Sequence, residues 1–108
     1  MIINFAILNI AIAPTDLKVT PVSDKEIKLI WTPPNPMNGV SRFFATTNGS
    51  NPQTCEVNTP STTCIISNLT AYTDYEVSLR AGDSVVSNPQ YIGSTDVTNT
   101  TKTLPTGM

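Results

Sequence analysis

The sequence predicts an all-β fold in which seven short strands form an antiparallel sandwich of two sheets. Hydrophobic residues alternate with polar ones in short runs, the pattern of strands that bury one face. Turn-forming Pro, Gly and Asn residues separate these runs, and the nine prolines leave no window with a long helical period. Only 13% of the residues are charged, and abundant Thr, Ser and Asn suit strands and turns better than helices.

The first three strands are indicated by alternation and by the prolines that bound them. Residues 17–20 alternate Leu and Val with Lys and Thr, shortly after a proline. Residues 27–31 place Ile, Leu and Trp on one face, and two prolines end this run. Residues 40–47 place Phe43 and Ala45 on one face, with Phe and Thr on the other.

The remaining strands are shorter or richer in polar residues. Residues 54–57 form a brief run, and residues 62–67 place a cysteine and an isoleucine on the same face. The stretch 69–81 contains the most regular alternation, and a Thr-rich segment that ends at residues 103–105 is the last strand.

Tyr75 opens the sixth strand, and the rest of the chain is organised around it. Tyr75 has the same parity as Val77, so its ring should point inward while its hydroxyl needs a partner. Leu69 lies six residues upstream, which is the pattern of a tyrosine corner. Trp31 is the expected centre of the core, packed with Leu69, Tyr75 and Val77.

These motifs resemble a fibronectin type III domain, which implies an immunoglobulin-like sandwich of that family's topology. The matching residues are Pro14-x-x-Leu17-x-Val19, Ile27-x-Leu29-x-Trp31-x-x-Pro34 and Leu69-x-x-x-Thr73-x-Tyr75-x-Val77-x-Leu79-x-Ala81. The resemblance covers residues 14–105 and leaves residues 106–108 as a tail. An immunoglobulin domain would instead place a cysteine at the position of Val77.

Residues 1–13 form an apolar lead-in with several interpretations. The segment is too short to cross a bilayer as a helix, so we expect no direct membrane insertion. It resembles the centre of a signal peptide but has no Lys or Arg before the apolar run. A linker from a preceding domain and a truncated gene model are the alternatives.

Cys55 and Cys64 have eight residues between them, and two interpretations compete. A disulfide would join neighbouring strands in a protein of an oxidising compartment. Free thiols would be inert residues of a cytosolic protein. Candidate N-glycosylation sites at Asn48, Asn68 and Asn99 favour a secretory route, although the alternative for Asn48 is a tight type I′ turn.

The sequence argues against catalysis and against nucleic-acid binding. There is no histidine, so a His-based triad, base or metal ligand is excluded, and we expect no cofactor. Asp74 and Glu76 lie two apart on a strand, which is typical of a solvated face. Six basic residues and a net charge of -2 provide no basic patch for nucleic acid.

The resemblance implies a noncatalytic, monomeric module of an extracellular or cell-surface protein of receptor-like or adhesion type. Such a module acts as a spacer or as a surface for protein partners or neighbouring domains. The candidate partner-binding loop residues are Pro34, Asn35, Met37, Val85, Val86 and Tyr91, with packing over the sandwich end as the alternative. Two other functions remain open: an accessory domain of a secreted carbohydrate-active enzyme, and a free-standing secreted surface antigen.

Overall fold

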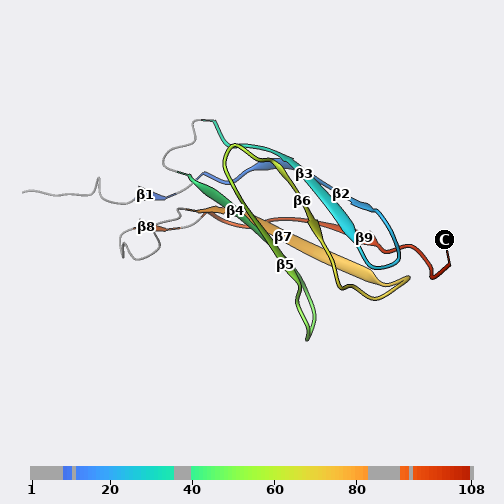
Figure 1. Cartoon of the computed structure of the whole chain (residues 1–108). Helices are drawn as coiled ribbons and strands as arrows, with labels where there is room; N and C mark the ends of the chain where they lie inside the picture. The colour runs from blue at the N-terminus through green and yellow to red at the C-terminus, as the bar shows by residue number, and fades with distance from the viewer. Residues whose placement is uncertain (1–8, 11, 36–39, 83–90, 93, 108) are drawn as a thin grey trace, which may run out of the picture.

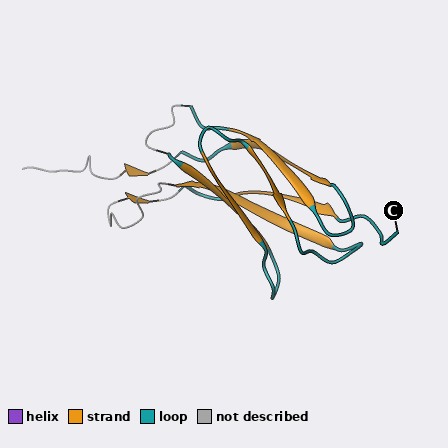
Figure 2. Cartoon of the chain, viewed as in Figure 1, coloured by secondary structure: helices purple, strands orange, loops and turns teal. Residues whose placement is uncertain are grey.

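The computed structural model describes residues 9–10, 12–35, 40–82, 91–92 and 94–107, and these residues form strands and loops without a helix (Figure 2). The strands in chain order are β1 (Asn9–Ile10), β2 (Thr15–Pro21), β3 (Ile27–Thr32), β4 (Arg42–Thr47), β5 (Thr54–Asn58), β6 (Thr63–Ile66), β7 (Asp74–Gly82), β8 (Tyr91–Ile92) and β9 (Val97–Lys102).

Seven of these strands form the two layers of an antiparallel sandwich (Figure 1). One sheet has the order β2-β3-β6 and the other the order β5-β4-β7-β9. The predicted fold class is therefore confirmed. A two-residue parallel pair, β1 with β8, was not predicted, and it brings the backbone of residues 9–10 beside that of residues 91–92.

The core lies between the two sheets and is built from the inward positions of each strand. Trp31 is only 4% exposed, and its ring meets the ring of Phe43 edge-on, with 5.3 Å between the centroids. The buried hydrophobic residues are Leu17, Ile27, Leu29, Trp31, Val40, Phe43, Ala45, Ile66, Leu69, Val77, Leu79 and Ala81. Because these positions follow the period-2 pattern, the alternate positions of each strand face outward.

The turn before β7 is held from two sides. The Tyr75 ring packs partly buried against the core, and its hydroxyl accepts a hydrogen bond from the backbone N–H of Thr70 at 2.8 Å. Thr103, which follows β9, donates to the Thr70 carbonyl at 2.6 Å and accepts from the Thr73 N–H at 3.0 Å. The end of the last strand is thereby fixed to the turn between β6 and β7.

Candidate functional site

The predicted loop surface is only partly represented in the described residues. Pro34 is buried rather than exposed, because the chain still faces the core two residues after β3 ends, whereas Asn35 is exposed. Met37, Val85 and Val86 lie outside the described residues. Tyr91 lies in β8, but only its backbone pairing is described. Among the described side chains of this predicted surface, Asn35 is therefore the exposed one.

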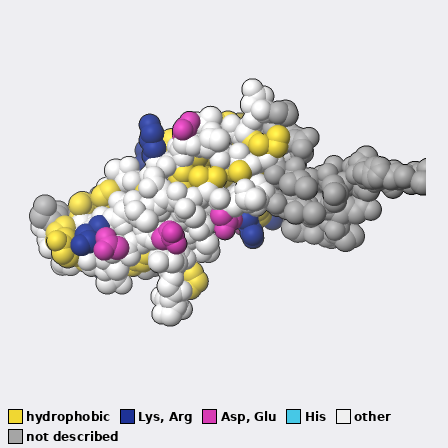
Figure 3. Space-filling model, turned by 180° about the vertical axis from the view of Figure 1, so that it is seen from behind, with side chains coloured by type: hydrophobic (Ala, Val, Ile, Leu, Met, Phe, Trp, Pro, Cys, Tyr) yellow, Lys and Arg dark blue, Asp and Glu magenta, His cyan; other side chains and the backbone are white. Residues whose placement is uncertain are grey.

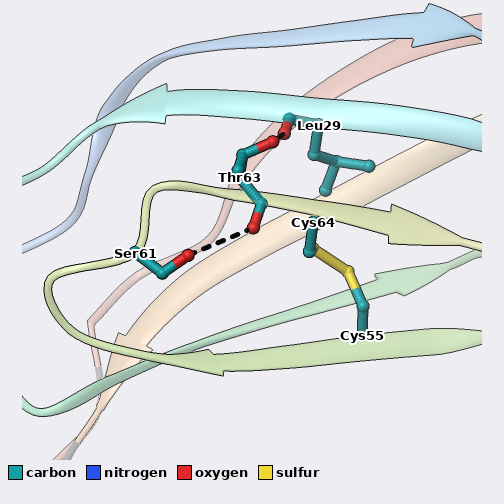
Figure 4. The surroundings of a disulfide bond; sticks show 5 residues. All are labelled: Leu29, Cys55, Ser61, Thr63 and Cys64. Carbon is teal, nitrogen blue, oxygen red and sulfur yellow. Dashed lines mark hydrogen bonds between the residues drawn. A yellow bond between two sulfur atoms is a disulfide. The ribbon is translucent and has the colours of Figure 1, made fainter.

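The two cysteines form a disulfide that links the two sheets. Cys55 is on β5, an edge strand of the four-stranded sheet, and Cys64 is on β6, an edge strand of the other sheet (Figure 4). Beside it, the Thr63 hydroxyl donates to the Leu29 carbonyl at 2.8 Å and so ties β6 to β3. The disulfide is therefore structural and closes one edge of the sandwich.

The three sequon asparagines occupy different environments. Asn48 starts the loop after β4, and its side-chain oxygen accepts a hydrogen bond from the Glu76 N–H. A type I′ turn needs a positive φ at both central residues, but only Gly49 of this pair has one, so this is not a type I′ turn. Asn68 is exposed in a turn with φ of 64°. Asn99 lies within β9, where its amide nitrogen donates to the Leu17 carbonyl at 2.9 Å. Asn48 and Asn68 border one shallow hollow, between this loop and the Tyr75 turn.

A second hollow, of about 330 Å³, lies on the outer face of the four-stranded sheet and is the better candidate site. Phe44 occupies an outward position of β4, directly opposite Glu56 on β5 and Arg80 on β7. The neighbouring outward row contains Thr46, with Thr54 on one side and Ser78 on the other. The lining residues are Phe44, Ala45, Thr46, Thr54, Cys55, Glu56, Ser78, Arg80 and Asp96.

Two guanidinium groups lie over the half-buried Phe44 ring. The Cζ atom of Arg42 is 4.8 Å from the ring centroid, and that of Arg80 is 5.8 Å away. Arg42 also forms an ion pair with Glu56, whereas Arg80 makes no ion pair within the described residues. Continuing the β7–β9 register by one residue places Asp96 opposite Arg80. The row across the sheet thus begins with Glu56 and ends with Asp96, and the guanidinium groups lie over the Phe44 ring between these two carboxylates.

The position of the Phe44 ring depends on a glycine. Gly82 ends β7, and a Cβ atom built there would lie 2.8 Å from Cε2 of Phe44. The ring therefore covers the space that a side chain at residue 82 would fill, a pairing known from aromatic rescue of glycines in sheets. Sequence alternation placed Phe44 on the face opposite Phe43, but it did not reveal which residues would surround it.

The described residues contain no cluster of three or more His, Cys, Asp or Glu side chains that could hold a metal ion. Over the same residues, no helix is long and apolar enough to span a membrane. On the face seen in Figure 3, Lys and Arg side chains are scattered among Asp and Glu, and neither sign dominates. The outer face of the four-stranded sheet therefore presents a contact surface with one aromatic ring and both acidic and basic side chains.

Comparison with known proteins supports the same fold. A family model described as "Fibronectin type III domain" matches residues 12–101. The protein "Phosphatidylinositol phosphatase PTPRQ" of Rattus norvegicus is 36% identical over 69 residues, which is 64% of this chain and 3% of that protein. The chain thus corresponds to a small part of that relative, whose name describes the whole protein.

Two solved structures illustrate the likeness of fold. The fn3 domain of human collagen alpha-1(XX) has a TM-score of 0.71 at 19% identity, covering 89% of this chain and 88% of that one. The FN1–FN3 domains of chicken CNTN1 have a TM-score of 0.70 at 20% identity, covering 84% of this chain and 30% of that one. At these identities the comparison establishes the fold alone.

Proposed function

Because the chain belongs to the fibronectin type III family, we propose that it is a noncatalytic module of an extracellular or cell-surface protein, and that it contacts a protein partner through the outer face of its four-stranded sheet. The single observation that carries this proposal is the outward Phe44 ring, which lines a hollow on this face and has two guanidinium groups over it. Aromatic residues and arginines are the residue types enriched at the centres of protein interfaces.

The disulfide supports the secretory part of the proposal. Disulfides persist in oxidising compartments and are rare where thiols are kept reduced. Cys55 and Cys64 lie on edge strands of different sheets and are joined in the structure. The exposed sequon residues Asn48 and Asn68 are consistent with the same route, since N-glycans attach at the surface.

The absence of histidine from the sequence supports a noncatalytic role, because it removes the commonest general base. The hollow itself is open and lined by hydroxyls, charged groups and one ring. Such a surface is suited to recognition, since no lining residue is a nucleophile paired with a base.

The test is to secrete the full chain from eukaryotic cells behind a heterologous signal sequence and to measure its intact mass. We expect a glycosidase-sensitive mass, no alkylation without reductant, and two alkylated thiols after reduction. A secreted product with two free thiols and no glycan would contradict the extracellular assignment. A Cys55→Ala/Cys64→Ala variant shows whether the alkylation signal comes from this pair.

A further inference from the structure

We propose that the Phe44 hollow binds a carboxylate side chain of the protein partner through Arg80, the one arginine that lines it. This inference rests on the proposed function, because it names the chemistry of the partner for the same sheet face. Three observations support it: the position of Arg80 over the Phe44 ring, the hydroxyl groups that line the same hollow, and the order of charges across the sheet.

The two arginines are positioned in advance of binding. Both guanidinium groups lie within 6 Å of the centroid of one ring, at 4.8 Å for Arg42 and 5.8 Å for Arg80. A guanidinium that stacks on a ring keeps its N–H edges available for a carboxylate. Arg42 already shares its charge with Glu56, whereas Arg80 has no ion pair among the described residues. The guanidinium of Arg80 is therefore the group available to pair with a carboxylate of the partner.

Hydroxyl donors line the same hollow. Thr54 and Ser78 lie on either side of Thr46, in the row next to Phe44. The hydroxyls of Thr54 and Ser78 make no hydrogen bond to any other described residue, while that of Thr46 donates to the Thr47 carbonyl. A carboxylate held by Arg80 has a second oxygen, and these hydroxyls are donors that can satisfy it.

The order of charges across the sheet selects the kind of partner. Across the four strands the row contains Glu56, Phe44, Arg80 and Asp96 in that order, so one arginine and one ring lie between two carboxylates. A complementary surface carries an acidic group at its centre and basic or neutral groups around it. A polyanion such as nucleic acid is disfavoured because both ends of the row would repel it.

A second copy of the chain is also disfavoured as the occupant. When two such faces meet with their rows aligned, the twofold axis lies in the interface plane, either along the row or across it. An axis along the row sets each residue of the row against its own copy, and an axis across the row sets Glu56 against Asp96 and Phe44 against Arg80. Both place like charges together, so the structure favours a different protein as the partner.

The experiment titrates the isotope-labelled full chain with two short, capped peptides and follows the backbone amide signals. One peptide has a central Glu among Val and Thr residues with a Lys near each end; the other has Gln in place of Glu. We expect the Glu peptide to shift the signals of Phe44, Ser78 and Arg80, and to bind at least about tenfold tighter than the Gln peptide. Salt should weaken the Glu peptide more than the Gln peptide.

The key variant is Arg80→Gln, matched by Lys102→Gln, which removes the same charge from β9 at the far end of the sheet. Arg80→Gln should abolish the preference for Glu, and Lys102→Gln should retain it. Equal binding of the two peptides, equal effects of the two variants, or no shifts at about 5 mM peptide would overturn the inference. Because this readout does not involve secretion, glycan or disulfide, its failure is distinguishable from failure of the extracellular assignment.

Discussion

The Tyr75 hydroxyl accepts a hydrogen bond from the backbone N–H of Thr70 at 2.8 Å, so the ring that opens β7 also fixes the turn before it. The ring itself packs against the core while its hydroxyl reaches the chain five residues upstream. One side chain therefore connects the interior of the sandwich to the turn that reverses the chain between the two sheets.

Tyr75→Phe should lower the free energy of unfolding by about 1 kcal/mol, because the Thr70 N–H loses its partner but can be hydrated at the surface. The measurement is a chemical denaturation curve. Tyr72→Phe is the matched control, since Tyr72 is 62% exposed and its hydroxyl makes no hydrogen bond to a described residue. Equal losses for the two variants would show that the Tyr75 hydroxyl does not stabilise the turn.

Thr103→Val should cost about 1–3 kcal/mol, although the two side chains are nearly the same size. Thr103 is buried, and its hydroxyl donates to the Thr70 carbonyl and accepts from the Thr73 N–H. Valine leaves both backbone groups without this partner. Thr100→Val, at an exposed position of β9, should change stability by less than about 0.5 kcal/mol in the same denaturation experiment. A harmless Thr103→Val would contradict the bridging role.

The strands and much of the core could be predicted because they depend on local alternation. Trp31, Phe43 and Val77 are buried at positions that period 2 places inward. Features that depend on register between distant strands could not be predicted in this way. Thr103 reaches a turn about thirty residues upstream, and its polar side chain gives no sign of burial in the sequence.

The candidate site also depends on the register between distant strands. Alternation alone places Phe44 outward, but its neighbours Glu56 and Arg80 come from two other strands and are set by pairing register. The burial of Pro34 could not be predicted from composition either, because a cluster of prolines indicates an exposed loop. Local pattern therefore predicts which elements form, whereas non-local register decides which side chains meet.

Trp31→Ala should cost about 3–5 kcal/mol, because the indole is almost fully buried against Phe43. Trp31→Phe should cost less, about 1–2 kcal/mol, since it keeps an aromatic ring and loses no hydrogen bond. The indole Nε1 is buried without an acceptor among the described residues, so its removal leaves no partner unpaired. Denaturation midpoints of the two variants test this order, and a Phe variant as unstable as the Ala variant would contradict it.

Gly82→Ala should destabilise the domain by about 1–2 kcal/mol, because the new methyl group overlaps the Phe44 ring. In a Phe44→Leu background the same change should cost little or become slightly favourable, since alanine restricts the unfolded chain more than glycine does. A double-mutant cycle measures this coupling. An equal cost of Gly82→Ala in both backgrounds would show that the ring is not what excludes a side chain at residue 82.

Reducing the Cys55–Cys64 disulfide should lower the free energy of unfolding by about 2.5–3 kcal/mol, the loop-entropy value for a short closed loop. The two residues are nine apart in sequence and lie on different sheets, so the bond limits the unfolded chain and holds one edge of the sandwich closed. Denaturation with and without reductant measures the effect. The Cys55→Ala/Cys64→Ala variant should be less stable than the oxidised protein and unaffected by reductant. If that variant matches the oxidised protein in stability, hydrogen bonds such as that from Thr63 to Leu29 are sufficient to hold β6 in place.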